Sequence, residues 1–392
     1  MAKMISIICN IYYLSFGVFC TLKRSFFYFQ QSIYFLNFVL DPKIAYVWAM
    51  NTSNHPITIK DIARKFNCSP STVSRALNNH PLINEETRKN IQEYANRMGY
   101  QRNTLSLGLR HSKSGTVGVI IPNLSHFHET AMLDGLQSVL QTRGYMLTIC
   151  VTNESYILEK EYVEKLLACR VEGIFLSVSQ ETYHSGHYEH LENILHRYIP
   201  LIFIDREYDG VEATSITVDD YLGAFTATEH LILRGCRRIA HLKGLIGLTV
   251  SEKRCKGYKD CLEKYNIPFE DNLVVNTNFK AESAVVPTRR LMSLPNPPDA
   301  IFGVNDYVSI AAMQVILDMG FSVPEQVAVI GFDNSPFAAY FNPTLSSVNR
   351  SSKLIGEEAA RLFLNNSETT TMQKENIILP PELIIRGSTL KL

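Results

Sequence analysis

The sequence predicts a small all-α head followed by a larger α/β body made of two lobes with parallel sheets. Only helical patterns occur between residues 59 and 98, whereas short apolar segments alternate with longer amphipathic ones from Val117 onward. This alternation runs through two successive stretches of the body. The chain of 392 residues, 46% of them hydrophobic, is long enough for two or three domains with substantial cores.

Residues 1–49 form a hydrophobic N-terminal extension that differs from the rest of the chain. Its segment "ISIICNIYYLSFGVFC" resembles a signal peptide or a short membrane span, and Asp41 is its only acidic residue. Because it has neither amphipathic periodicity nor helix caps, we expect it to be a start-site artefact, with translation beginning at Met50. A membrane anchor is the second interpretation. A cleaved export signal is the third, and the lack of a small-residue cleavage site disfavours it.

The segment "IKDIARKFNCSPSTVSRALN", residues 59–78, predicts two short helices joined by a turn over residues 67–69. Apolar residues in each half recur at helical spacing, and Ser69 and Pro70 suit the N-cap and first position of the second helix. A third helix begins after Asn84 and ends at Gly99. The second helix leaves polar side chains facing outward, which can hydrogen-bond phosphates and base edges. These outward residues are Ser71, Thr72, Ser74, Arg75 and Asn78.

Residues 57–110 resemble the head of a lactose-repressor-type (LacI/GalR) transcription regulator through "TIKDIA", "STVSRALN", "NEETRKNIQEYANRMGY" and "LGLR". The resemblance implies a helix-turn-helix DNA-binding domain over residues 56–102, with its second helix in the major groove. Pro70, Ser71 and Arg75 match the base-reading positions of the family. Phosphates would be bound by Thr58, Ser69, Thr72, Ser74 and Asn78. The family usually has glycine where this chain has Asn67, which can also adopt the left-handed backbone conformation.

The distribution of charge favours DNA as the partner of the head. Residues 56–113 contain ten Lys or Arg and four Asp or Glu, whereas residues 114–392 contain 24 and 33. A basic head on an acidic body confines phosphate binding to one small module. Without the resemblance, the same pattern would also fit a helical hairpin without a ligand, or a protein-binding three-helix bundle.

Residues 103–115, "NTLSLGLRHSKSG", have the composition of a linker. The resemblance implies a hinge that becomes helical when two subunits bind an operator, and Leu109 matches the leucine that the family inserts into the minor groove. Gly108 would make the helical hinge about 1 kcal/mol less favourable than a better helix former would. A plain tether is the alternative.

Residues 116–392 alternate predicted strands and helices as in parallel sheets covered on both faces. Strands are predicted at "VGVII", "YMLTIC", "GIFLSV", "PLIFID", "SITVD", "RIAHL", "AIFGV", "VAVIGFD" and "PPELIIRG", and helices near 129–143, 157–169, 187–197, 220–234, 251–265, 281–293, 305–319 and 351–366. We expect a first lobe of about 116–217 and 351–376, and a second of about 218–350 and 377–392. The resemblance continues through "PDAIFGVND", "VAVIGFD" and "EEAARLFL", and implies a periplasmic-binding-protein-like core for effector binding and dimerisation.

Ligands of open α/β lobes bind beyond the carboxyl ends of the strands. Carboxylates, amides and a guanidinium follow several predicted strands, and such groups suit the vicinal hydroxyls of a sugar or sugar derivative. The candidate effector-binding residues at strand ends are Ser125, His126, His128, Asp205, Arg206, Asn305, Asp306 and Asp333. The resemblance adds Arg254, in "RCKGY", and Phe279 as an aromatic that stacks on the effector ring.

Two features leave the effector site open at this stage. Asp205 and Asp333 would also serve as turn caps, and Asn305 as the N-cap of its helix. The segment "SHFH" departs from the "SNPFF" pattern usual in the family, so the resemblance does not specify the effector chemistry at that wall.

The sequence disfavours a metal site, a cofactor and catalysis. Its eight cysteines are scattered without a C-x-x-C pair, which indicates neither a zinc finger nor a disulfide framework. His184, His187 and His190 in "HSGHYEH" suggest a metal site, but their steps of three residues drift around a helix. Nucleotide-binding, zinc-protease and nucleophile-elbow motifs are missing. We therefore expect no enzyme activity, no cofactor and no metal.

The favoured function is a ligand-responsive, DNA-binding transcription regulator in the cytoplasm, and specifically a repressor of carbohydrate-utilisation genes. It would act as a homodimer or a dimer of dimers on a pseudo-palindromic operator, without a membrane partner. The alternative is an exported or membrane-tethered sugar-binding receptor, suggested by residues 1–49 and the two lobes. The sequence leaves open whether the effector releases DNA or tightens its binding.

Overall fold

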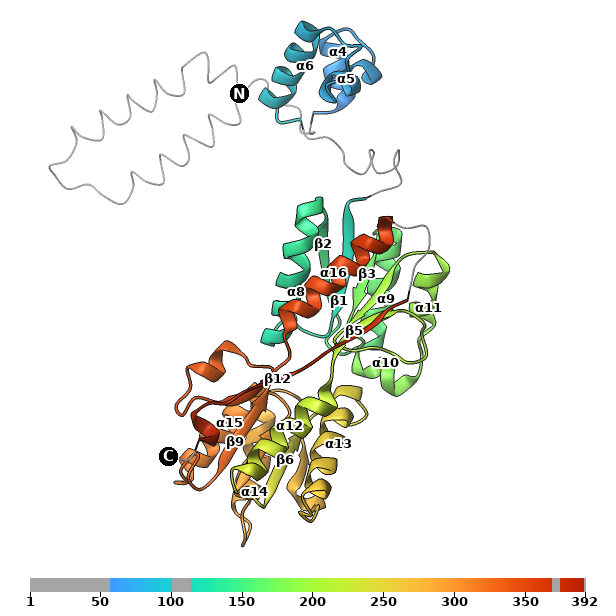
Figure 1. Ribbon diagram of the computed structural model, residues 1–392. Coiled ribbons are helices and arrows are strands. Elements are labelled where there is room, and N and C mark those ends of the chain that lie inside the picture. Colours follow the sequence, from blue (N-terminus) through green and yellow to red (C-terminus); the bar gives the residue numbers. More distant parts are fainter. Residues whose placement is uncertain (1–56, 101–113, 369–373, 391–392) are drawn as a thin grey trace, which may run out of the picture. The chain divides into compact units, whose positions relative to one another are not determined.

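The computed structural model describes residues 57–100, 114–368 and 374–390, which belong to two units that divide near residue 103 (Figure 1). The N-terminal extension over residues 1–49 and Leu109 of the predicted hinge lie outside these described residues. Within the same ranges, no helix is both long enough and apolar enough to cross a membrane.

Three helices form the described head, as the sequence predicts: α4 (Ile59–Lys65), α5 (Pro70–Leu77) and α6 (Glu85–Arg97). They form because their apolar residues share one stripe, and the stripes meet in a common core. This core consists of Ile62, Ala63, Val73, Ala76, Ile91 and Ala95.

Local side chains start each helix of the head and shape its turn. Thr58 and Asp61 form a capping box at α4, with the Thr58 N–H donating to Asp61 Oδ2 at 3.0 Å. Ser69 Oγ accepts the N–H of Thr72 at 3.1 Å, and α6 is capped in the same way by its preceding asparagine. Asn67 has a φ of 45°, which confirms the left-handed conformation expected in the turn between α4 and α5.

The first lobe contains a six-stranded parallel sheet in the order β11-β5-β4-β3-β1-β2. Its strands are β1 (Thr116–Ile121), β2 (Met146–Val151), β3 (Ile174–Leu176), β4 (Leu201–Ile204), β5 (Thr214–Val218) and β11 (Asn376–Leu379). Helices α8 (Phe127–Leu140) and α16 (Ser352–Glu368) pack on one face. Helices α9 (Tyr156–Ala168) and α11 (Glu189–His196) pack on the other, and the short α10 (Gln180–Ser185) lies between them in sequence.

The second lobe has a six-stranded sheet in the order β12-β10-β9-β8-β6-β7, parallel except for the antiparallel pair β10 and β12. Its strands are β6 (Ile239–Lys243), β7 (Val274–Asn276), β8 (Ala300–Gly303), β9 (Ala328–Phe332), β10 (Ser346–Asn349) and β12 (Glu382–Ile384). Helices α12 (Asp220–Leu233) and α13 (Thr249–Lys264) cover one face. Helices α14 (Glu282–Met292) and α15 (Asp306–Asp318) cover the other.

The chain crosses between the lobes three times, from β5 to α12, from β10 to α16 and from β11 to β12. Figure 1 shows the red C-terminal segment running from one lobe to the other. The last crossing follows Leu379, rather than about residue 376 as expected, because residues 376–379 pair with β5 in the first sheet.

Most predicted strands and helices of the body are present, but α10, β7, β10 and β11 were not predicted. These elements are short, and all four contain polar residues, which weaken their strand or helix pattern. In β10, "SSVN", Ser346 and Ser347 are nevertheless buried, because their hydroxyls bond to Thr389 at 2.7 Å and Asp306 at 2.6 Å. The hydrogen-bond partners of these buried hydroxyls are distant in the sequence, so a local pattern does not predict this strand.

Candidate functional site

The exposed face of α5 is the candidate DNA-binding surface. Ser69, Pro70, Ser71, Arg75 and Asn78 are exposed, whereas Thr72 and Ser74 are half-buried beside them. The Ser69 hydroxyl lies 2.6 Å from that of Ser71 and 2.9 Å from that of Thr72, so three hydroxyls cluster at the helix N-terminus. A helix N-terminus attracts anions, because its first N–H groups are unpaired and its dipole is positive there.

The rest of the head holds α5 in position. Gln92 of α6 donates from Nε2 to the carbonyl of Ala76 at 3.0 Å and to Asn79 Oδ1 at 2.8 Å. Val73 and Ala76 are fully buried against the other helices. The polar face is therefore presented on a fixed helix rather than on a loop. Thr58 is exposed at the start of α4.

A cavity of about 470 Å³ lies between the two lobes of the core. Four of the predicted effector residues line it: Ser125, His126, Arg206 and Phe279. It also contains Asn153, Glu154, Lys280, Glu282 and Tyr307, which were not predicted from the sequence. Asn153, Glu154 and Tyr307 follow the predicted strands β2 and β8, so the strand-end rule could have found them. Lys280 and Glu282 follow β7, which was not predicted.

The side chains of the cavity wall are held by specific contacts. Arg206 donates from one terminal nitrogen to both oxygens of Glu154 at 3.0 Å and lies almost fully buried. Phe279 has a φ of 66°, and its carbonyl accepts from Asn305 Nδ2 at 2.9 Å. Asn305 also caps α15 by accepting the N–H of Val308 at 2.9 Å. The structure thus places Asn305 behind the wall, as a cap that also positions Phe279.

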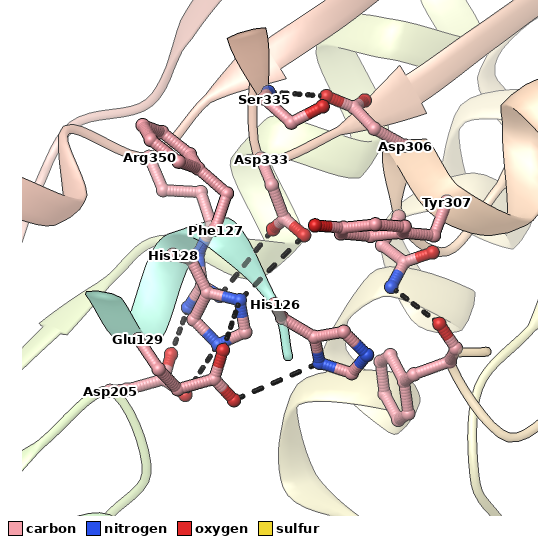
Figure 2. Close-up of polar contacts among 12 residues, drawn as sticks. His126, Phe127, His128, Glu129, Asp205, Asp306, Tyr307, Asp333, Ser335 and Arg350 are labelled. Atoms are coloured by element: carbon pink, nitrogen blue, oxygen red, sulfur yellow. Dashed lines mark hydrogen bonds and ion pairs between the residues drawn. The ribbon is translucent and has the colours of Figure 1, made fainter. Parts of the chain in front are cut away.

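His128, Asp205 and Asp333 meet behind the cavity in a buried charge cluster with Glu129 and Arg350 (Figure 2). His128 Nδ1 lies 3.1 Å from Glu129 Oε2 and 3.9 Å from Asp333 Oδ2, and His128 Nε2 lies 3.7 Å from Asp205 Oδ2. Arg350 pairs with Asp205 and lies 3.6 Å from Asp333 Oδ1. Asp205 and Asp333 have φ values of 66° and 105°, an uncommon conformation that aims both carboxylates into this cluster.

The charges of the cluster stabilise one another. Although burial alone would raise the pKa of Asp205, Arg350 and His128 hold it well below its ordinary value. Burial alone would lower the pKa of His128, but Glu129 and Asp205 raise it above the ordinary value. These opposing shifts favour a charged imidazole beside charged carboxylates. Glu129 and Arg350 were not selected from the sequence, because neither directly follows a predicted strand.

Asp306 and Arg254 lie deeper in the second lobe. Asp306 accepts from the Ser335 N–H and the Ser347 hydroxyl, each at 2.6 Å, and burial together with nearby Asp333 raises its pKa to about 7. Arg254 is 1% exposed, pairs with Asp220 at 2.8 Å and lies over the Phe332 ring, 3.7 Å from its centroid. In this arrangement neither side chain lines the cavity.

The three histidines of "HSGHYEH" do not converge on one point. His184 Nε2 lies 2.9 Å from the carbonyl of Ile246, and buried His190 lies 2.8 Å from Glu159 Oε1. His187 is exposed and lies 3.7 Å from Glu189. Each therefore has a separate partner.

Comparisons with known proteins match both parts of the chain. A family model described as "Bacterial regulatory proteins, lacI family" matches residues 58–103, and one described as "Periplasmic binding protein-like domain" matches residues 228–389. The chain is 33% identical to the "Probable HTH-type transcriptional repressor ExuR" of Bacillus subtilis (strain 168), over 86% of this chain and 99% of that protein. It is 30% identical to the ribose operon repressor of Halalkalibacterium halodurans, over 85% of this chain and 97% of that protein.

The fold is also that of a solved regulator. A lac repressor dimer bound to operator and the anti-inducer ONPF is 23% identical, covers 86% of this chain and 100% of its own, and has a TM-score of 0.76.

Proposed function

Because this chain belongs to the lacI family of bacterial regulatory proteins, we propose that it represses carbohydrate-utilisation genes and that a sugar-like effector controls its affinity for the operator. Members of the family are transcription regulators, and we propose no catalytic activity for this chain. The observation that carries the proposal is the exposed polar face of α5, on a capped helix within a basic head.

The polar face of α5 binds DNA through two kinds of contact. Arg75 is exposed and can donate two parallel hydrogen bonds to the O6 and N7 atoms of guanine, which is worth about 1–3 kcal/mol of base discrimination. The hydroxyls of Ser69, Ser71 and Thr72 lie at the N-terminus of α5, where they suit phosphate or base-edge oxygens. Pro70 and Ser71 complete the base-reading edge, and Thr58, Ser74 and Asn78 flank it.

The cavity between the lobes binds the effector. Its volume of about 470 Å³ is that of a small-molecule site, and its mixture of amides, carboxylates and cations suits a polyhydroxylated ligand. Phe279 offers an apolar face at the wall, and Arg206 and Glu154 offer charged hydrogen-bonding groups. The ribose operon repressor among the relatives is named for a sugar operon, which supports a sugar as the effector class.

Effector binding acts on the DNA-binding head by changing the relative orientation of the two lobes. Contacts join the lobes beside the cavity, including the Tyr307 hydroxyl, which donates to the carbonyl of Ser125 at 3.2 Å. A ligand that favours one pose changes the spacing of two paired heads in a homodimer, and so changes operator affinity. Two-fold symmetry then requires a pseudo-palindromic operator, with Leu109 of each subunit near its centre. Action on DNA places the protein in the cytoplasm.

Selection of bound sequences from a random DNA duplex pool tests this proposal. We expect the purified chain to recover a pseudo-palindrome. Arg75→Ala should weaken binding by about 5- to 150-fold for each half-site and relax base preference at one position in each half-site, since about 1–3 kcal/mol of discrimination is lost per contact. Arg64→Ala, an exposed residue of α4 paired with Asp61, is the charge-matched control. It should reduce the salt dependence of binding and leave the base preference intact.

An operator without two-fold symmetry, or equal loss of base preference in both variants, would contradict the proposal. Repeating the selection with sugars and sugar acids identifies the effector and shows whether it releases DNA or tightens its binding. Phe279→Ala should weaken the effector response without changing operator binding in the absence of effector.

A further inference from the structure

The N-cap and first turn of α8 bring together three side chains of types that bind metals. His126, His128 and Glu129 each offer one ligand atom, and these atoms all lie within 4.8 Å of one another. Glu129 Oε1 lies 3.8 Å from His126 Nδ1, and Glu129 Oε2 lies 3.1 Å from His128 Nδ1. Ligand atoms bonded to one zinc ion at about 2.1 Å lie roughly 3 to 3.5 Å apart, so small side-chain shifts would complete such a site.

The buried ligand atoms lack hydrogen-bond partners. Glu129 is 1% exposed, and neither of its oxygens accepts a hydrogen bond within the described residues. The Nδ1 atom of His128 also has no hydrogen-bond partner there. Burial of a carboxylate without donors is costly, so Glu129 favours a cation beside it, which is either protonated His128 or a metal ion that replaces this proton. Figure 2 shows the Glu129 carboxylate between the two imidazole rings.

Neighbouring carboxylates provide the second layer that metal sites use. Asp205 Oδ2 lies 3.7 Å from His128 Nε2, on the side of the ring away from Glu129. A metal-binding histidine usually directs its second nitrogen at such a carboxylate, which fixes the ring orientation. Asp333, from the end of β9 in the second lobe, places Oδ2 3.9 Å from His128 Nδ1. Asp333 therefore adds negative charge beside the three ligands.

The site also has an entry path. His126 lines the cavity between the lobes, with 12% of its side chain exposed, whereas Glu129 lies behind it. An ion can reach the ligands through the cavity, first contacting His126.

We propose that His126, His128 and Glu129 bind one divalent transition-metal ion of the zinc class, with a water or effector oxygen in the open fourth position. Two imidazoles and a carboxylate form a ligand set that zinc accepts. The three ligands all belong to the first lobe, and Asp333 approaches His128 from the second. The site is independent of the DNA-binding proposal, since metal binding is measured without DNA.

Titration of the metal-free full chain with Zn²⁺, in competition with a chromophoric chelator, tests this site. We expect one ion per chain, and binding at least about tenfold weaker in Glu129→Gln and in His126→Ala. His187→Ala, which alters an exposed histidine with a separate partner, should bind zinc like the parent chain. Cobalt(II) bound in place of zinc should give the visible absorption of a four-coordinate site, and both ligand variants should lose it.

Circular dichroism spectra of the metal-free variants establish that each is folded. If Glu129→Gln does not fold, His126→Ala decides the test, because His126 is partly exposed at the cavity wall. Absence of stoichiometric zinc binding would overturn the proposal, and would mean that a proton on His128 alone neutralises Glu129. Equal zinc affinity in the ligand variants and the parent chain would overturn it as well.

Discussion

His241 is a buried histidine that the structure keeps neutral. Its ring stacks on Phe302, with centroids 4.7 Å apart, and Nδ1 lies 3.0 Å from the Phe302 carbonyl, which accepts the Nδ1–H of the neutral ring. The other nitrogen, Nε2, has no hydrogen-bond partner within the described residues. Burial lowers the pKa of His241 to about 4. At neutral pH the ring therefore behaves as part of the apolar core of the second lobe.

Stability should consequently fall as the pH is lowered from about 6.5 to about 4. Between these values the unfolded chain protonates this histidine and the folded chain does not, so protons favour unfolding, by on the order of 3 kcal/mol over the whole window. His241→Phe removes the titrating group and retains an aromatic ring. Urea unfolding at several pH values should show a smaller decrease in unfolding free energy for this variant than for the parent chain.

The control for this prediction is His187→Phe, which alters an exposed histidine. It should retain the full pH dependence of the parent chain. The same dependence in His241→Phe would show that other groups cause the loss of stability in acid.

At the scale of elements, glycines allow two pairs of helices to pack with their backbones close together. A Cβ atom on Gly135 of α8 would lie 2.1 Å from the carbonyl oxygen of Lys353 in α16. A Cβ atom on Gly356 of α16 would lie 2.0 Å from the carbonyl oxygen of Met132. The second lobe repeats this arrangement, since a Cβ atom on Gly257 of α13 would lie 2.3 Å from the carbonyl oxygen of Tyr221 in α12. Backbone atoms cannot move aside as flexible side chains can, so only glycine permits these contacts.

Gly135→Ala should therefore destabilise the core by about 1–3 kcal/mol, although alanine is the better helix former by about 1 kcal/mol. The clash with Lys353 forces α8 and α16 apart and outweighs the gain in helix propensity. Thermal and urea unfolding measure the effect. Gln137→Ala, at an exposed position of the same helix, should change the unfolding free energy by less than about 0.5 kcal/mol. A stabilised Gly135→Ala variant would show that the helices separate without cost.

At the scale of the whole core, Arg350 joins the two lobes. It follows β10, where the chain crosses back to the first lobe, and is almost fully buried. Its guanidinium pairs with Asp205 of the first lobe and lies 3.6 Å from Asp333 Oδ1 of the second. The surface pair of Lys253 and Glu207, 3.7 Å apart, also connects the lobes but is much more exposed. The buried network therefore dominates the electrostatic connection between the lobes.

Arg350→Met should lower the unfolding free energy by about 3–5 kcal/mol, because it removes the guanidinium from two buried carboxylates and leaves them only the His128 imidazole. The variant should also bind its operator with a weaker response to effector, since the pose of the lobes is less defined. Arg361→Met, which breaks exposed pairs with Glu357 and Glu358, should cost no more than about 1 kcal/mol. Equal unfolding free energies for the two variants would show that Arg350 does not hold the lobes together.

The sequence by itself determined the features that depend on neighbouring residues. Helix stripes, caps and the turn residue Asn67 specify the head within about forty residues, and the alternation of apolar segments specifies most strands and helices of the two lobes. Strand ends also identified three of the residues at the cavity wall, Ser125, His126 and Arg206, and the family resemblance added Phe279.

Only the tertiary structure decided which distant groups meet. Asp205 and Asp333 cluster with Glu129 and Arg350, whereas Arg254 pairs with Asp220 inside the second lobe. The buried serines of β10 became strand residues because partners more than forty residues away satisfy their hydroxyls. Periodicity and capping act over a few residues and can be recognised in sequence. Charge pairing and burial depend on the juxtaposition of the lobes, which no local pattern encodes.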